Sequence, residues 1–212
     1  MIQAQAPEFV SARPQARLAV AVLIANIVAG GLAMVAYGVF IAIELAVTLD
    51  DSSVQLANYV VAVLLAIYYV TTLLALTTFG IWLHRIATNM PGLGADDVRF
   101  RPGSGAYLHP AATAIDAWKG ATTDQLRTSR QDRWYMKAPY YYRVWWQLPI
   151  GGALLWAYIS RRAPSPIPFV PSMNVISLAL FVATAALTIL VIRQVTARQD
   201  RKQELILTGR LA

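Results

Sequence analysis

Two histidines and three aspartates are the residues of this sequence whose types suit a metal site or acid–base catalysis. His84 and His109 are the only histidines, and Asp96, Asp97 and Asp116 lie in the same polar stretch of the chain. Their spacing lacks the i, i+4 pair that places two ligands on one face of a helix. The sequence therefore predicts no catalytic residue, no metal site and no bound cofactor.

Other common catalytic constellations are also missing. The chain has no cysteine, which excludes a disulfide, a thiolate nucleophile and a cysteine-ligated metal or iron–sulfur cluster. It has no glycine-rich phosphate loop with a lysine, no nucleophile elbow and no convincing Ser/His/Asp set. These absences predict that the protein is not an enzyme.

Polar residues inside apolar segments are the next candidates for function, because burying them in a membrane is costly. Asn26 lies in the first apolar segment, about 13 Å along a helix from Arg17, which is near mid-depth. We expect it to form an interhelical hydrogen bond, worth about 0.6 kcal/mol in a membrane. The second segment carries hydroxyl groups that either satisfy one another and the backbone or line a polar cavity. They belong to Tyr59, Tyr68, Tyr69, Thr71, Thr72, Thr77 and Thr78.

The elements that position these residues follow from composition. Of the 212 residues, 57% are hydrophobic and only 14% are charged, and the mean hydropathy is +0.49, whereas a soluble domain has about a quarter charged residues. Four apolar segments reach or exceed the roughly 20 residues that a membrane-spanning helix needs. They are 18–43, 54–83, 139–160 and 172–192. We predict an all-α fold, an integral membrane four-helix transmembrane bundle forming a single membrane domain over 1–212.

The distribution of cations predicts the orientation. The N-terminal arm 1–17 holds two Lys or Arg, the loop 84–138 with the adjoining Arg143 holds nine, and the tail 193–212 holds five, which is sixteen of eighteen. The positive-inside rule places these three parts in the cytoplasm, and we expect the bacterial inner membrane. The net charge of +7 then reflects membrane orientation and predicts no nucleic-acid partner.

The cytoplasmic loop between the second and third helices is expected to be partly helical. Between Ala111 and Lys119, Ile115 and Trp118 lie three residues apart on one face. This short helix either lies in the lipid headgroup layer or folds against the bundle. At the start of the third segment, Trp145 and Trp146 belong to an aromatic cluster typical of a membrane interface, and the nearby Arg143 is a candidate for anionic lipid.

Small residues recur in the first segment. Ala21, Ala25, Ala29 and Ala33 are spaced by four residues, next to Asn26. Such a ridge lets another helix approach closely. The expected neighbour is either a helix of the same bundle or a helix of another subunit.

The end of the second segment reads Phe79-Gly-Ile-Trp82-Leu-His-Arg85-Ile-Ala-Thr-Asn89. In this motif Trp82 is expected to anchor at the membrane interface, Arg85 to reach lipid phosphate and Asn89 to end the helix. The stretch resembles the Phe-x-x-Trp-x-x-Arg-x-x-x-Asn pattern of a bacterial membrane-protein family, domain of unknown function 4328. Further matches are Arg101-Pro102-Gly103, Tyr107-Leu108-His109-Pro110, Ala117-Trp118 and Trp145-Trp146. The resemblance covers roughly 75–160 and implies the four-span layout, but no activity.

Three functions remain open at this point. The first is a non-enzymatic accessory, structural or assembly subunit of a larger bacterial membrane complex, with membrane lipids and other integral membrane subunits as partners. The second is a protein that binds or transports a lipid or small molecule, using the hydroxyl-bearing second segment and a helix break at Pro149. The third is a membrane enzyme, which requires His84, His109 and an aspartate to converge.

Overall fold

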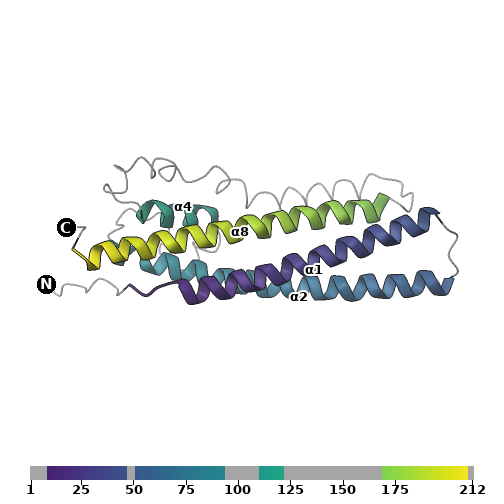
Figure 1. The fold of residues 1–212 in the computed structure, drawn as a ribbon, viewed down its shortest axis with the longest axis horizontal. Coiled ribbons are helices and arrows are strands. Elements are labelled where there is room, and N and C mark those ends of the chain that lie inside the picture. The colour runs from purple at the N-terminus through teal and green to yellow at the C-terminus, as the bar shows by residue number, and fades with distance from the viewer. Residues whose placement is uncertain (1–8, 47–50, 94–109, 122–168, 210–212) are drawn as a thin grey trace. The chain divides into compact units, whose positions relative to one another are not determined.

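The computed structural model of the protein describes residues 9–46, 51–93, 110–121 and 169–209, and within these ranges it contains helices and no strands. These ranges hold three long helices and a short one, and a 3₁₀ turn, η1, follows the second long helix. Figure 1 shows how the chain runs through them. The elements are α1 (Arg13–Ala46), α2 (Asp51–Asn89), η1 (Pro91–Leu93), α4 (Pro110–Gly120) and α8 (Phe169–Leu207).

The three long helices are long and apolar enough to cross a membrane, by length and composition. They contain 34, 39 and 39 residues, and a 39-residue helix extends about 58 Å, roughly twice the thickness of a hydrocarbon core. These helices support a membrane protein that is all-helical over the described residues. Of the four expected spans, 18–43, 54–83 and 172–192 fall on α1, α2 and α8, and 139–160 lies outside the described residues.

The long helices extend beyond the apolar segments that mark them in the sequence. α1 begins at Arg13, inside the expected arm, and α8 continues through most of the expected tail to Leu207. At the start of α1, the hydroxyl of Ser11 accepts a hydrogen bond from the backbone N–H of Arg13 at 3.3 Å, as an N-cap does. Gly209, with a φ of +65°, follows the end of α8, as expected for a left-handed terminating residue. Hydropathy locates the apolar part of each helix and misses these capped polar extensions.

The chain divides into two compact units. Of the described residues, unit 1 comprises 9–20, 77–93, 110–121 and 188–209, and unit 2 comprises 21–46, 51–76 and 169–187. Each of the three long helices contributes residues to both units, and α4 belongs to unit 1.

In unit 2, α1, α2 and α8 pack closely at a glycine. A Cβ atom added to Gly30 would lie 3.0 Å from Cγ2 of Val182 and 3.2 Å from Cε2 of Tyr68. Around it lies a core of buried residues, Ala29, Ala33, Tyr68 and Leu178. The absence of a side chain at Gly30 is what allows the three helices to approach here.

The prediction that four alanines of α1 form a packing ridge is correct for only two of them. Ala29 and Ala33 are buried in unit 2, but Ala21 and Ala25 are exposed. Residues four apart drift by about 40° per step around a helix, so such a ridge turns away from its partner. A seam that stays in contact alternates steps of three and four, and the buried positions of α1 in unit 2 do this. They are Leu23, Asn26, Gly30 and Ala33, and Ala29 is buried beside Gly30.

Candidate functional site: a polar junction of helix ends in unit 1

Unit 1 brings together the start of α1, the end of α2, α4 and the end of α8 around a buried core. Trp82 of α2 and Trp118 of α4 are its largest fully buried side chains. The others, all with less than 2% of their surface exposed, are Leu83, Ile86, Met90, Leu93, Val191, Ile192, Val195 and Gln199. Polar contacts join the helix ends around this core, and we call this network the junction.

Trp82 lies inside the protein, not at a lipid interface. Its side chain has 0% exposure, its indole N–H donates a hydrogen bond to the hydroxyl of Thr196 at 2.9 Å, and its ring lies beside Phe79. A buried indole needs an acceptor for its N–H, and α8 supplies one. The expectation of an interfacial anchor at this position is therefore wrong in the folded chain.

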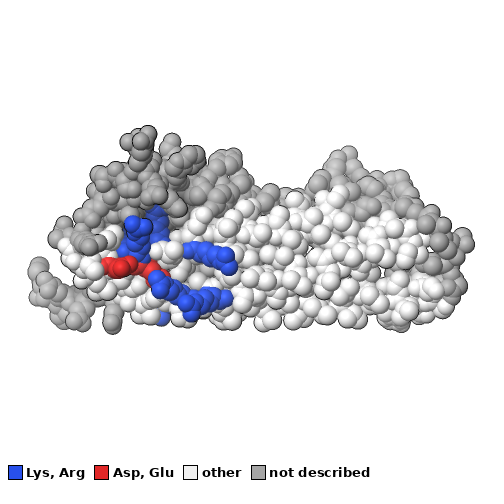
Figure 2. Space-filling model, in the orientation of Figure 1, with Lys and Arg blue, Asp and Glu red and all other residues white. Residues whose placement is uncertain are grey.

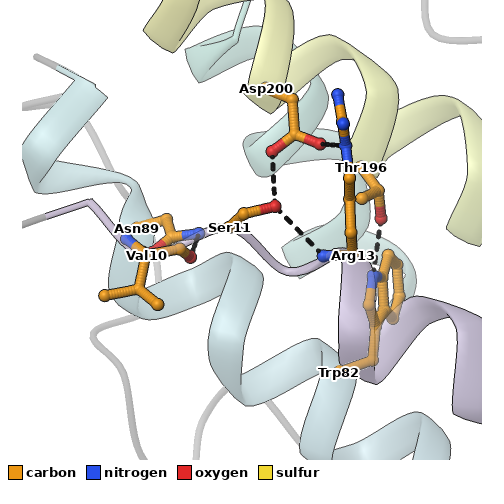
Figure 3. A network of polar contacts seen from close by, with 7 residues as sticks. All are labelled: Val10, Ser11, Arg13, Trp82, Asn89, Thr196 and Asp200. Carbon is orange, nitrogen blue, oxygen red and sulfur yellow. Dashed lines mark hydrogen bonds and ion pairs between the residues drawn. The ribbon is translucent and has the colours of Figure 1, made fainter.

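Asn89 is the last residue of α2, and its side chain is paired with the N-terminal segment. The backbone N–H of Val10 donates to Oδ1 of Asn89 at 3.3 Å, and Nδ2 of Asn89 donates to the carbonyl of Val10 at 2.9 Å. Asn89 is 2% exposed. The helix ends where the sequence motif indicates, and the asparagine also fixes the chain that leads into α1 (Figure 3).

The start of α1 is joined to α8 through Asp200. The hydroxyl of Ser11 donates to Oδ1 of Asp200 at 2.9 Å, and Nε of Arg13 donates to Oδ2 of the same carboxylate. Figure 3 shows Ser11 and Arg13 approaching Asp200 from the same segment. One carboxylate thus accepts hydrogen bonds from both the capping residue and the first residue of α1.

The same part of α8 also holds α2 and α4. The side-chain amide of Gln199 donates to the carbonyl of Ile86 at 3.1 Å. Nζ of Lys202 donates to the carbonyl of Gly120 at 2.6 Å, where a cation is favourable because the last carbonyls of α4 lack helical partners. These contacts, together with that of Asp200, join α8 to α1, α2 and α4 in unit 1.

The short loop helix folds against the protein. α4 coincides with the expected helix at Ala111–Lys119, and Trp118 is 1% exposed. The guanidinium carbon of Arg198 lies 3.9 Å from the centroid of the Trp118 ring, a cation–π geometry. Of the two expected positions, packing against the bundle is correct for Trp118, and contact with lipid headgroups is not.

The remaining site residues are placed as follows. Arg85 is half-buried on α2, His84 is exposed and Asp116 is buried. In the part of the chain that the structure describes, no group of three His, Cys, Asp or Glu side chains could hold a metal ion. The other expected candidates lie outside the described residues. They are Asp96, Asp97, His109, Arg143, Trp145 and Trp146.

Asn26 forms the expected interhelical contact in unit 2. Its side-chain amide lies 3.1 Å and 2.8 Å from the hydroxyls of Thr71 and Thr72, and 3.3 Å from the carbonyl of Tyr68, donating to each. Both threonine hydroxyls also donate to that carbonyl, at 2.9 and 2.8 Å. For Thr71 and Thr72, the expected hydrogen bonding to the backbone is confirmed.

Sequence reasoning missed most of the junction. Ser11 carried a local signal, since a serine two residues before the start of a helix favours an N-cap. Thr196, Gln199 and Lys202 gave no such signal, because their partners are 82 to 114 positions away in the chain.

No family model, curated protein or solved structure matches the chain. The junction itself is built from amide, hydroxyl, indole and charged groups that hold helix ends together.

Proposed function

We propose that this protein is a non-enzymatic structural or accessory subunit of a bacterial inner-membrane protein complex. In this proposal it has four transmembrane helices, with both termini and the loop 84–138 in the cytoplasm. The observation that carries the proposal is the difference between two exposed faces of α2.

The connectivity of the helices supports the fourth span. Unit 1 contains the start of α1, the end of α2, α4 and the end of α8. In this proposal each long helix crosses the membrane once, and a fourth crossing between α4 and α8 returns the chain to the start of α8. The apolar segment 139–160 is the stretch there that suits a span. The resemblance to domain of unknown function 4328 belongs to the same proposal.

α2 is the least covered of the three long helices. Of its most apolar stretch only 17% is buried, compared with 39% for α1 and 33% for α8. Its exposed residues form two stripes, each following alternating steps of three and four. The Tyr69 stripe comprises Tyr59, Ala62, Ala66, Tyr69, Leu73 and Leu76. The Val70 stripe comprises Leu56, Val60, Val63, Ile67, Val70 and Leu74.

The two stripes differ in composition at equal depth. The Val70 stripe consists of aliphatic side chains, as suits contact with lipid tails. The Tyr69 stripe combines Ala62 and Ala66, which permit close helix approach, with two tyrosines. Small and hydrogen-bonding residues of this kind are typical of helix–helix contacts in membranes.

Tyr69 is the most informative member of its stripe. It lies about 25 Å along α2 from Ser52 and about 22 Å from His84, so it is near the middle of the apolar segment, and it is 60% exposed. Tyrosine usually lies at membrane interfaces, because a hydroxyl in hydrocarbon without an acceptor is costly. A helix of another subunit packed on the Tyr69 stripe would supply the acceptor.

Binding or transport of a small molecule receives less support. Thr71 and Thr72 of the second segment are engaged by Asn26, so they do not present free hydroxyls to a ligand. The enzyme hypothesis receives no support from His84, which is exposed.

Co-purification tests the proposal. The tagged full chain is isolated in gentle detergent from its native membranes, beside the pairs Ala66→Leu/Tyr69→Leu and, as a matched control on the other stripe, Val63→Leu/Val70→Leu. We expect a membrane protein to co-purify in constant ratio with the wild type and the control. Its yield should fall at least tenfold with the Tyr69-stripe pair. A wild-type chain that purifies alone, or equal yields from both variants, would contradict the proposal.

A further inference from the structure

Arg17 of α1 and Arg193 of α8 lie in unit 1 where the continuous exposed apolar surface of each helix ends. On α8, exposed large apolar side chains return only at the last turn, at Ile206 and Leu207. Arg17 directly precedes Leu18, which is 54% exposed, and Arg193 follows Leu190, which is 45% exposed. Both arginine side chains are themselves exposed. In a membrane-spanning helix, a cation at this boundary lies near the level of the lipid phosphates.

The ion pair between Arg13 and Asp200 fixes the register of these two antiparallel helices. From that pair, Arg17 is about 6 Å further along α1 and Arg193 is about 10 Å back along α8, so their depths differ by only about 4–5 Å. Steps of four and seven residues turn a helix by a net angle of only about 40° and 20°. Both arginines therefore emerge on the side of their helices that carries the pair.

Among the described residues, the acidic groups of α8 do not pair with Arg17 or Arg193. Asp200 is already paired with Arg13 and Ser11, and among the described residues the structure records no ion pair for Arg17 or Arg193. Glu204 lies about 16 Å along α8 from Arg193. Figure 2 shows Lys and Arg side chains gathered in one patch beside the acidic side chains, with uncharged surface over the rest of the described residues on this face.

We propose that Arg17 and Arg193 together bind the phosphate of an anionic phospholipid. A guanidinium group donates two parallel hydrogen bonds to a phosphate, and two such groups at one depth on neighbouring helices can hold one headgroup between them. The exposed Leu18 and Leu190 would contact its acyl chains. This site is independent of the subunit contact on the Tyr69 stripe.

The test measures binding of short-chain phosphatidylglycerol to the purified full chain in neutral detergent, by its effect on Tm. The variant Arg17→Gln/Arg193→Gln is compared with Arg201→Gln, which removes an exposed arginine about 12 Å further along α8. We expect saturable stabilisation of the wild type and of Arg201→Gln, and at least a tenfold weaker apparent affinity for the double variant.

Two further arms identify the ligand. Short-chain phosphatidylcholine tests the requirement for net negative charge, and inorganic phosphate tests a free anion. Little stabilisation by either supports an anionic-lipid site. Equal stabilisation by phosphatidylcholine or by phosphate overturns it, and so does an equal loss of affinity in Arg201→Gln, which would indicate diffuse charge attraction. If the double variant is unfolded without lipid, Arg17→Gln and Arg193→Gln are measured separately instead. The proposal is overturned if both single variants bind phosphatidylglycerol with the affinity of the wild type.

Discussion

The side-chain amide of Asn89 and the backbone of Val10 form a reciprocal pair of hydrogen bonds, in which each residue both donates and accepts. A carboxylate could accept from the N–H of Val10 but could not donate to its carbonyl. An asparagine at the end of α2 therefore does more than end a helix. It holds the segment that leads into Ser11 and the start of α1.

This pairing predicts the effect of removing the amide. Asn89→Ala should lower the free energy of unfolding by about 1–3 kcal/mol, because two part-buried hydrogen bonds are lost at about 0.5–1.5 kcal/mol each. Asn89→Asp should also destabilise, because it loses the donor and buries a charge. Unfolding of the full chain in mixed micelles measures both. Asn58, exposed on the same helix, gives the control Asn58→Ala, and an equal effect of the two alanine substitutions would refute the role of the pair.

The contact between Trp82 and Thr196 predicts an energetic coupling between α2 and α8. Trp82→Phe removes the N–H while keeping an aromatic ring, and Thr196→Val removes the acceptor with little change in shape. Each substitution should lower the free energy of unfolding. The loss in the double variant should be smaller than the sum of the two single losses by about 0.5–1.5 kcal/mol. A double-mutant cycle on the same unfolding equilibrium gives this number. Strict additivity would mean that the hydrogen bond contributes nothing.

The adjacent glycines of α1 offer a test of close packing in unit 2. Gly30→Ala should destabilise by about 1–3 kcal/mol, since overpacking forces Val182 or Tyr68 to move. Gly31→Ala places its methyl group where no atom lies within 4 Å, so it should be neutral or stabilising by up to about 1 kcal/mol. Thermal unfolding of the two variants side by side decides the point. The packing is wrong if Gly30→Ala is as stable as Gly31→Ala.

The burial of Trp118 predicts that this side chain holds α4 against the rest of unit 1. Trp118→Ala removes a buried ring and its contact with Arg198, at a cost of about 3 kcal/mol or more, which corresponds to a hundredfold or larger increase in local opening. Hydrogen–deuterium exchange of the amides of α4 should therefore accelerate by that factor. Lys119→Ala, at the exposed neighbouring position, should leave exchange within twofold. Unchanged protection in Trp118→Ala would show that α4 is held by other contacts.

Some parts of the fold could be predicted from the sequence because they depend on local composition. The apolar parts of α1, α2 and α8 are long enough to be recognised as membrane-spanning segments. α4 is indicated by Ile115 and Trp118, which lie three residues apart on one helix face. Asn26 could also be predicted to bond across helices, because an amide in an apolar segment has few other ways to be satisfied.

Other features depend on tertiary partners that the sequence does not reveal. Trp82 next to a polar stretch looks the same whether it faces headgroups or a hydroxyl such as that of Thr196. Ala21 and Ala25 are of the same residue type as Ala29 and Ala33. The first two are exposed and the last two are buried, because only the last two lie on the face of α1 that packs against other helices. The polar end of α8 has the composition of a solvated tail, yet Asp200 and Lys202 are contact residues because unit 1 folds around them.

The most direct test of the account is a photo-crosslink placed at Tyr69 and, in a second variant, at Val70 in the native membrane. Because the two positions are adjacent on α2 at nearly the same depth, membrane access is matched and only the face differs. We predict that position 69 crosslinks to the same membrane protein that co-purifies with the chain. Position 70 should give only lipid adducts. Lipid adducts alone from both positions would contradict the proposal that this protein is a subunit packed through the Tyr69 stripe.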